Sequence, residues 1–270
     1  MRCLALAVLL LAATAVRDQQ RRESAIILPG GPPVGYAYVA NRADSTVCAV
    51  EIETLARKGC VTLQSVPDGV FYVALTREVW VTTPRDNSLQ IFSVQDPAAL
   101  VASGTMKLDG QPEGYAVDPQ RGVVFTNLED KDKTLVIDAR SRRVTATWNP
   151  ECGEKGPRGI ALDADAARVF VGCNAEGLRE FSANGKPLAR LATGAGVDNI
   201  DWSSSTHLVY VASAADGKLT LVKAGPDGAL SVVFTAPTAA GGRTVIVDGS
   251  GTAYVPDSKG GRLIVVKPSP

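Results

Sequence analysis

Five charged residues stand at the start of repeated apolar segments, and their types and spacing are those of side chains that recognise a polar ligand. They are Asp68, Glu113, Arg158, Asp198 and Arg243. Carboxylates and guanidinium groups gathered in one place favour a small zwitterion or a carboxylate, because arginine offers paired donors to an anion. The alternative is that neighbouring charges simply pair with one another at a solvated rim, at about 0 to 1 kcal/mol for each pair.

Two aromatic residues, Tyr115 and Trp202, lie near the start of the same segments. They are candidates for the apolar walls of a ligand site. The alternative is a structural role, since aromatic side chains in repeat proteins mostly pack between neighbouring sheets.

The charged positions belong to an internal repeat whose clearest mark is the tetrapeptide at residues 38–41, Tyr-Val-Ala-Asn. Related tetrapeptides recur at intervals of 40 to 46 residues, and they begin at Trp80, Val124, Phe170, Tyr210 and Tyr254. A period in the forties is typical of the blades of a β-propeller. We therefore predict an all-β fold, a single propeller over residues 25–268 with six four-stranded antiparallel blades, or seven as the alternative.

The strand order within a blade places the five charged residues. Innermost strands surround the central channel of a propeller, so their starting residues share one rim and form the mouth of a funnel. The segment from Ala25 to Leu28 has two possible places: it opens the first blade, or it closes the last blade, whose own segment Leu263 to Lys267 is only a third strand. Some such closure is needed, because exposed sheet edges pair with other chains.

These repeats resemble the YVTN-type β-propeller family of secreted bacterial and archaeal proteins. The family pattern is Pro-x-Gly-(Ile or Val)-Ala-Val, a turn, Val-Tyr-Val-(Ala or Thr)-Asn and then Thr-Val. Residues 157–163, Pro-Arg-Gly-Ile-Ala-Leu-Asp, match it, as do residues 38–41 and the Ser-Thr-Val of residues 45–47. The resemblance covers Ala25 to Pro268 and implies a propeller, often with seven blades, but no particular ligand.

The chain begins with a pattern typical of an export signal. Arg2 precedes an apolar stretch from Leu4 to Ala12, and the small residues at 13–15 predict cleavage after Ala15. The stretch is shorter than the ~20 residues that cross a bilayer, so we expect no membrane span. Residues 16–24 read as a flexible leader. The predicted location is the periplasm or the exterior.

Four cysteines follow the predicted signal peptide, and an even number in an exported chain indicates two disulfides. Cys48 and Cys60 lie on two strands of one hairpin, whose register brings them together. Cys152 lies in the link between the third and fourth blades and Cys173 ends a strand of the fourth, on the same face. We predict the pairs Cys48–Cys60 and Cys152–Cys173, without a metal, because no Cys-x-x-Cys spacing is present.

Composition argues against several classes of function. Lys plus Arg and Asp plus Glu are 28 each, which leaves no basic excess for nucleic acid. The single histidine, His207, lies in a predicted turn and has no evident partner for base catalysis. The acidic turn at residues 129–132 is either a peripheral calcium site or a solvated loop.

Propeller lactonases, which this architecture resembles, hold a divalent cation with Glu, Asn and Asp. Glu113, Asp198 and Asn199 are the residues this chain offers, although Arg158 would oppose a cation there. The sequence favours a non-enzymatic, monomeric binding protein without a cofactor, acting on a small polar ligand or a protein partner through its funnel face. A metal-dependent lactonase or gluconolactonase-like hydrolase is the alternative, and a surface scaffold that uses its blade faces is a third.

Overall fold

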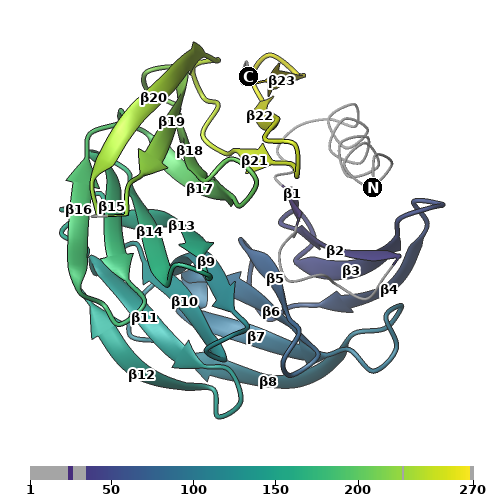
Figure 1. Cartoon of the computed structure of the whole chain (residues 1–270). Coiled ribbons are helices and arrows are strands. Elements are labelled where there is room, and N and C mark those ends of the chain that lie inside the picture. The colour runs from purple at the N-terminus through teal and green to yellow at the C-terminus, as the bar shows by residue number, and fades with distance from the viewer. Residues whose placement is uncertain (1–23, 27–34, 227, 268–270) are drawn as a thin grey trace. The chain divides into compact units, whose positions relative to one another are not determined.

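The computed structural model describes residues 24–26, 35–226 and 228–267. The predicted signal peptide lies outside the described residues, as does the predicted leader up to residue 23. In the described part of the chain, strands β1 to β23 form six antiparallel sheets in chain order (Figure 1). These sheets are the blades of a β-propeller, as the repeat predicts.

Each sheet is a meander in which consecutive strands pair. The first sheet contains β1 (Ser24–Ile26), β2 (Tyr36–Asn41), β3 (Thr46–Glu51) and β4 (Arg57–Thr62). The second contains β5 (Val70–Val73), β6 (Glu78–Thr83), β7 (Ser88–Ser93) and β8 (Val101–Lys107). The third contains β9 (Pro112–Asp118), β10 (Val123–Leu128), β11 (Lys133–Asp138) and β12 (Arg143–Trp148). The fourth contains β13 (Pro157–Asp163), β14 (Arg168–Cys173), β15 (Gly177–Ser182) and β16 (Pro187–Leu191). The fifth contains β17 (Val197–Ser203), β18 (Leu208–Ser213), β19 (Lys218–Ala224) and β20 (Leu230–Pro237). The sixth contains β21 (Ile246–Val247), β22 (Ala253–Asp257) and β23 (Arg262–Val266).

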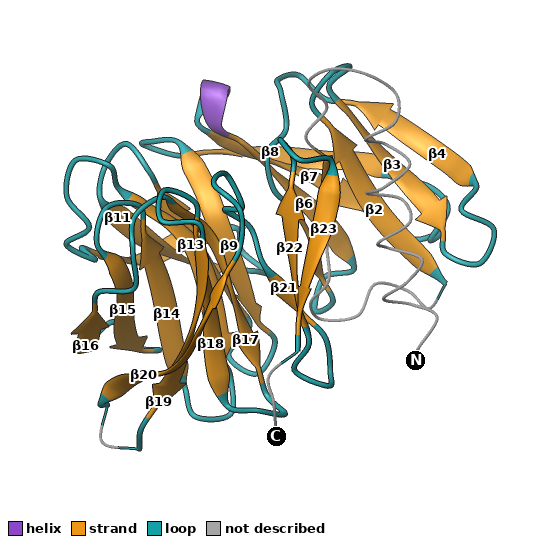
Figure 2. Cartoon of the chain, turned by 90° about the horizontal axis from the view of Figure 1, so that it is seen from above, coloured by secondary structure: helices purple, strands orange, loops and turns teal. Residues whose placement is uncertain are grey.

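Helix is almost absent from the described residues. They contain one short 3-10 helix, η1 (Pro84–Asp86), and strands make up the rest of the regular structure (Figure 2). No helix in this part of the chain is long and apolar enough to span a membrane.

The N-terminal strand takes one of the two places that the sequence left open. β1 pairs with β2 in antiparallel register, with Ser24 opposite Asn41 and Ile26 opposite Val39. β1 is therefore a strand of the first sheet. It opens the first blade and does not close the last. Ser24, the final residue of the predicted leader, is already part of this strand.

The described residues group into two compact units, and the third sheet contributes segments to both. The first unit holds the chain up to Glu113 together with Pro119–Val124 and Val136–Thr145, and the second holds Gly114–Asp118, Phe125–Leu135 and everything from Ala146 onward.

In the first unit, repeated aromatic residues join one sheet to the next. Tyr38 is fully buried, and its hydroxyl donates a 3.1 Å hydrogen bond to the Pro97 carbonyl of the second sheet. Burial raises the pKa of this phenol well above its ordinary value. In the second sheet, buried Glu78 accepts hydrogen bonds from Trp80 Nε1 at 2.9 Å and from Arg142 at 2.5 Å. The repeated tetrapeptide is thus a packing element.

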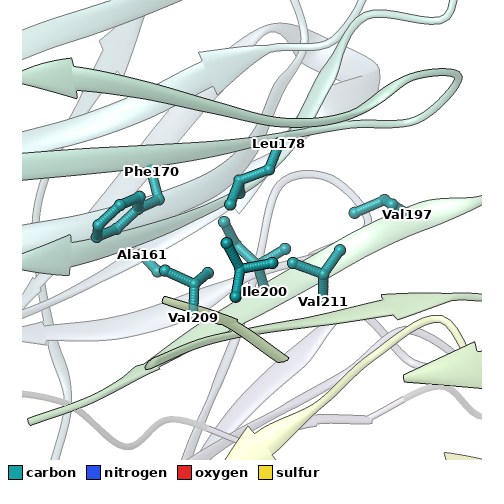
Figure 3. Close-up of a cluster of buried hydrophobic side chains, with 8 residues drawn as sticks. Ala161, Phe170, Leu178, Val197, Ile200, Val209 and Val211 are labelled. Atoms are coloured by element: carbon teal, nitrogen blue, oxygen red, sulfur yellow. The ribbon is translucent and has the colours of Figure 1, made fainter. Parts of the chain in front are cut away.

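The second unit has an apolar core between its successive sheets (Figure 3). Phe170 and Leu178 of the fourth sheet pack with Ile200, Val209 and Val211 of the fifth, and all five are buried. Each sheet therefore buries a face only when its neighbour is present, which is the physical basis of a repeat protein.

Candidate functional site

The predicted residue Arg158 lies in a β-bulge at the start of an inner strand. The register between β13 and β14 shifts between Pro157 and Ile160, so that Arg158 and Gly159 together oppose one residue of β14. A bulge kinks the strand and re-aims a side chain, which is why bulges are frequent beside functional sites.

The predicted residue Asp198 has the same environment one sheet later. β17 shifts register against β18 between Val197 and Ile200, which makes a bulge of Asp198 and Asn199. Asn199 is exposed, and its N–H donates a 3.1 Å hydrogen bond to the Arg243 carbonyl, just before the sixth sheet.

These bulges are in direct backbone contact with one another. A Cβ added to Gly159 would lie 2.7 Å from the Ile200 nitrogen and 2.9 Å from Asn199 Cα. Gly114 of β9 meets the backbone of Arg158 and Gly159 even more closely. The Gly of the Pro-x-Gly pattern is therefore required by the approach of the next inner strand.

In the second unit each predicted charge pairs with a side chain from an adjoining sheet. Arg158 contacts Glu129, which follows β10, and Arg243 Nε lies 3.2 Å from Asp198 Oδ2. The Arg243 side chain is 48% exposed, whereas that of Asp198 is 19% exposed. Both pairs bridge neighbouring sheets, as the pairing alternative expects. In the second pair the Arg243 side chain remains at the surface.

In the first unit, Asp68 contacts Arg42, which follows β2 of the preceding sheet. Glu113 is the second residue of β9. Arg42 and Glu129 were missed by sequence reasoning. Their signal was weak: each lies within two residues of the end of a repeated tetrapeptide, where the chain leaves the second strand of a blade.

A buried asparagine also connects two sheets at this level. Asn127, the last residue of its tetrapeptide, donates a 2.7 Å hydrogen bond to the Arg158 carbonyl and accepts one of 2.7 Å from the Thr134 hydroxyl. Asn174 makes a comparable 3.1 Å bond to the Val197 carbonyl. These amides hold the inner-strand bulges in position.

The two predicted aromatic residues have different surroundings. Trp202 stacks on Phe170 of the preceding sheet, with ring centroids 5.4 Å apart and an interplanar angle of 21°. This contact is the packing role that the sequence left as the alternative. Tyr115 is a partly buried residue of β9.

Asp201 is a further polar residue of an inner strand that sequence reasoning overlooked. Its carboxylate accepts hydrogen bonds from the Trp202 N–H at 2.9 Å and from the Val247 N–H of β21 at 2.8 Å. Burial raises the pKa of Asp201 to about 6, against the two hydrogen bonds that favour the charged form.

Asp201 therefore makes stability depend on pH. Because its folded pKa lies above its unfolded value of 3.8, its contribution is complete below about pH 4 and is lost as pH rises through about 6. We expect Asp201→Asn to remove up to about 3 kcal/mol of this decline between about pH 4 and pH 8. Urea unfolding across this range measures it, with exposed Glu53→Gln as the control. Parallel curves for wild type and D201N would contradict the assignment.

The cysteines pair as the sequence predicts. Cys48 and Cys60 lie opposite each other on β3 and β4, and Cys152 joins Cys173 at the end of β14. Asp132 accepts hydrogen bonds from the Cys152 N–H at 3.0 Å and the Gly153 N–H at 2.9 Å. The acidic turn is thus used to hold the disulfide loop.

Within the described residues, no group of three or more His, Cys, Asp or Glu side chains is arranged to hold a metal ion. His207 lies in a turn with φ of 54°, and its ring is 6.1 Å from that of Trp202. Of the residues considered for a lactonase cation, Asp198 and Asn199 belong to the second unit and Glu113 to the first.

Comparison with known proteins establishes the fold. No family model and no curated protein matches the chain. A functionally unknown protein from Desulfotomaculum acetoxidans is similar with a TM-score of 0.70 and 15% identity, over 86% of this chain and 79% of that one. A catalytically inactive virginiamycin B lyase from Staphylococcus aureus with quinupristin is similar with a TM-score of 0.72 and 11% identity, over 92% of this chain and 86% of that one.

A β-propeller domain from Myceliophteria thermophila is also similar, with a TM-score of 0.67 and 10% identity, over 87% of this chain and 81% of that one. At such low identity these likenesses concern the fold alone. The chain is a six-bladed β-propeller.

Proposed function

We propose that this chain is an exported binding protein of the YVTN type that takes a small polar ligand through its inner-strand site. The site consists of Arg158, Asp198, Asn199 and Arg243. Export is supported by the signal-like N-terminus and is compatible with the two disulfides. The YVTN assignment is supported by the repeated tetrapeptides.

One observation carries the binding proposal. Three successive inner-strand starts of the second unit are in backbone contact, and two of them present their polar residues from β-bulges. A structural ion pair needs no bulge, whereas a ligand site needs side chains held in a defined direction.

The chemistry of these side chains indicates the class of ligand. Arg243 offers paired donors to a carboxylate, and Asn199 offers both a donor and an acceptor. Asp198 lies beside Arg243 and complements an ammonium group. The favoured ligand is therefore a small zwitterion or a carboxylate that replaces part of the Asp198–Arg243 contact.

Isothermal titration with a panel of free amino acids and short mono- and dicarboxylates tests this proposal. We expect one class to bind, and Arg243→Ala to weaken binding by at least about tenfold, since a lost charge-assisted pair costs about 1.5 to 3 kcal/mol. Arg190→Ala, on exposed β16, is the matched control.

Two results would contradict the proposal. One is unchanged affinity in both Arg158→Ala and Arg243→Ala, and the other is failure of the whole panel to bind. Elemental analysis of the same preparation addresses the hydrolase. A stoichiometric divalent cation, with turnover of lactones, would favour that alternative.

A further inference from the structure

The sixth sheet, which lies in the second unit, has fewer strands than the other five sheets of the described chain. It contains β21, β22 and β23, whereas each of the others has four strands. No strand within residues 24–26, 35–226 and 228–267 pairs with the outer edge of β23. Main-chain donors and acceptors at a sheet edge are a template for another strand.

The geometry of β23 is that of an edge open to pairing. Four of the outer strands, β4, β8, β16 and β20, each carry a register shift against their neighbour. Bulges of this kind protect natural sheet edges. β23 instead pairs with β22 without a shift, from Ala253 opposite Val266 to Asp257 opposite Arg262. It contains no proline, and Val265 is 49% exposed.

An apolar surface lies beside this edge. Tyr210, Leu221 and Phe234 stand opposite one another across β18, β19 and β20. Tyr210 and Leu221 are buried in the cluster that Val255 and Ile264 of the last sheet also join. Phe234 continues this row by one strand and is 41% exposed. The last sheet ends one strand too early to cover it.

The corresponding row in the second sheet shows what such a position looks like when it is covered. There Trp80, Ile91 and Gly104 stand opposite one another, and the row ends in glycine. Arg142, from the outer hairpin of the third sheet, lies against Gly104 and bonds the Ser103 carbonyl at 3.1 Å.

In the fourth sheet the corresponding row also ends in a small residue. It consists of Phe170, Glu180 and Ala189. A small residue ends the row in the second and fourth sheets. A phenylalanine ends it beside the three-stranded sheet.

We propose that the outer edge of β23 and Phe234 form an acceptor site for an extended strand donated by a different protein. The donated main chain pairs with β23, and an apolar side chain packs on Phe234. Lys267, exposed just after β23, favours an acidic residue beside the donated segment, whereas Arg262 at the other end already bonds Asp257 at 2.9 Å. This site is separate from the inner-strand site.

A second copy of the chain is a poorer donor. Its four shifted outer strands have irregular edges, and in its own β23 the side chains of Ile264 and Val266 already pack against the cluster of the fifth sheet. A separate peptide segment has neither restriction.

The test uses the full chain and a fluorescein-labelled synthetic peptide of alternating valine and threonine with an aspartate at each end. Fluorescence anisotropy is expected to show saturable binding. Phe234→Asp is expected to weaken it by at least about tenfold, and Val144→Asp, at an exposed valine of β12, to leave it unchanged. Circular dichroism checks that both variants are folded.

A second probe leaves the protein unaltered. The same peptide methylated at alternate backbone nitrogens cannot pair with a strand edge, so it is expected to bind at least about tenfold more weakly. Equal binding of the two peptides would overturn the proposal, as would absence of binding. A Phe234-dependent dimer in sedimentation velocity, or a photo-crosslink from position 265 to the chain's own residues 16–23, would assign the site to another occupant and also overturn it.

Discussion

Gly159→Ala is expected to destabilise the protein by about 3 kcal/mol, which lowers the melting temperature by about 6–12 °C. The added Cβ would lie 2.7 Å from the Ile200 nitrogen and 3.0 Å from the Asn199 carbonyl carbon. Both neighbours are backbone atoms of the adjoining inner strand, which cannot rotate aside as a side chain can. Inner strands β13 and β17 would have to separate.

Gly249→Ala is the matched control for this substitution. Apart from its two chain neighbours, nothing lies within 4 Å of a Cβ added at Gly249. Alanine there restricts the unfolded chain, so the change should be neutral or stabilising by about 0.4–1 kcal/mol. Thermal unfolding followed by circular dichroism compares the two variants. A G159A protein as stable as G249A would show that the inner strands do not pack as described.

The second large effect concerns the disulfide between Cys152 and Cys173. The double variant Cys152→Ser, Cys173→Ser is expected to lose about 3 kcal/mol of unfolding free energy, because the bridge closes a loop of sequence separation 21. It also frees the link between the third and fourth sheets, which leads directly into the Arg158 bulge. Guanidinium unfolding of the oxidised proteins measures the loss.

Differences in burial give an internal control for the disulfide prediction. Cys152 and Cys173 are 1% and 0% exposed, whereas Cys60 lies at the surface. Mild reduction of the native protein should therefore open Cys48–Cys60 first, as alkylation and mass spectrometry would show. Rapid reduction of Cys152–Cys173 in the folded protein would contradict its buried position.

Local pattern was sufficient to predict much of the fold. The tetrapeptides beginning at Tyr38, Phe170 and Tyr210 recur because each is the second strand of a blade, and strand signals depend on residues close together in the chain. The pairing of Cys48 with Cys60 follows from hairpin register for the same reason.

The partners of the charged residues could not be predicted in this way. Asp68 was visible as a repeated charge, but its contact with Arg42 joins two sheets. The same holds for Arg158 and Glu129. Each partner lies in a turn that approaches the next inner strand only after the sheets pack, so no spacing in the sequence specifies it.

Strand period and residue type were sufficient to predict the repeat, the all-β class, the two disulfides and the positions that carry charge. Only the folded arrangement shows that β1 joins the first sheet, that Trp202 packs on Phe170, and that Asp201 receives a hydrogen bond from the next sheet. The same arrangement leaves Phe234 half-covered. The pairing of β1 depends on which strand edge it meets in the folded chain. The other three depend on packing between sheets, which is set by contacts distant in the chain.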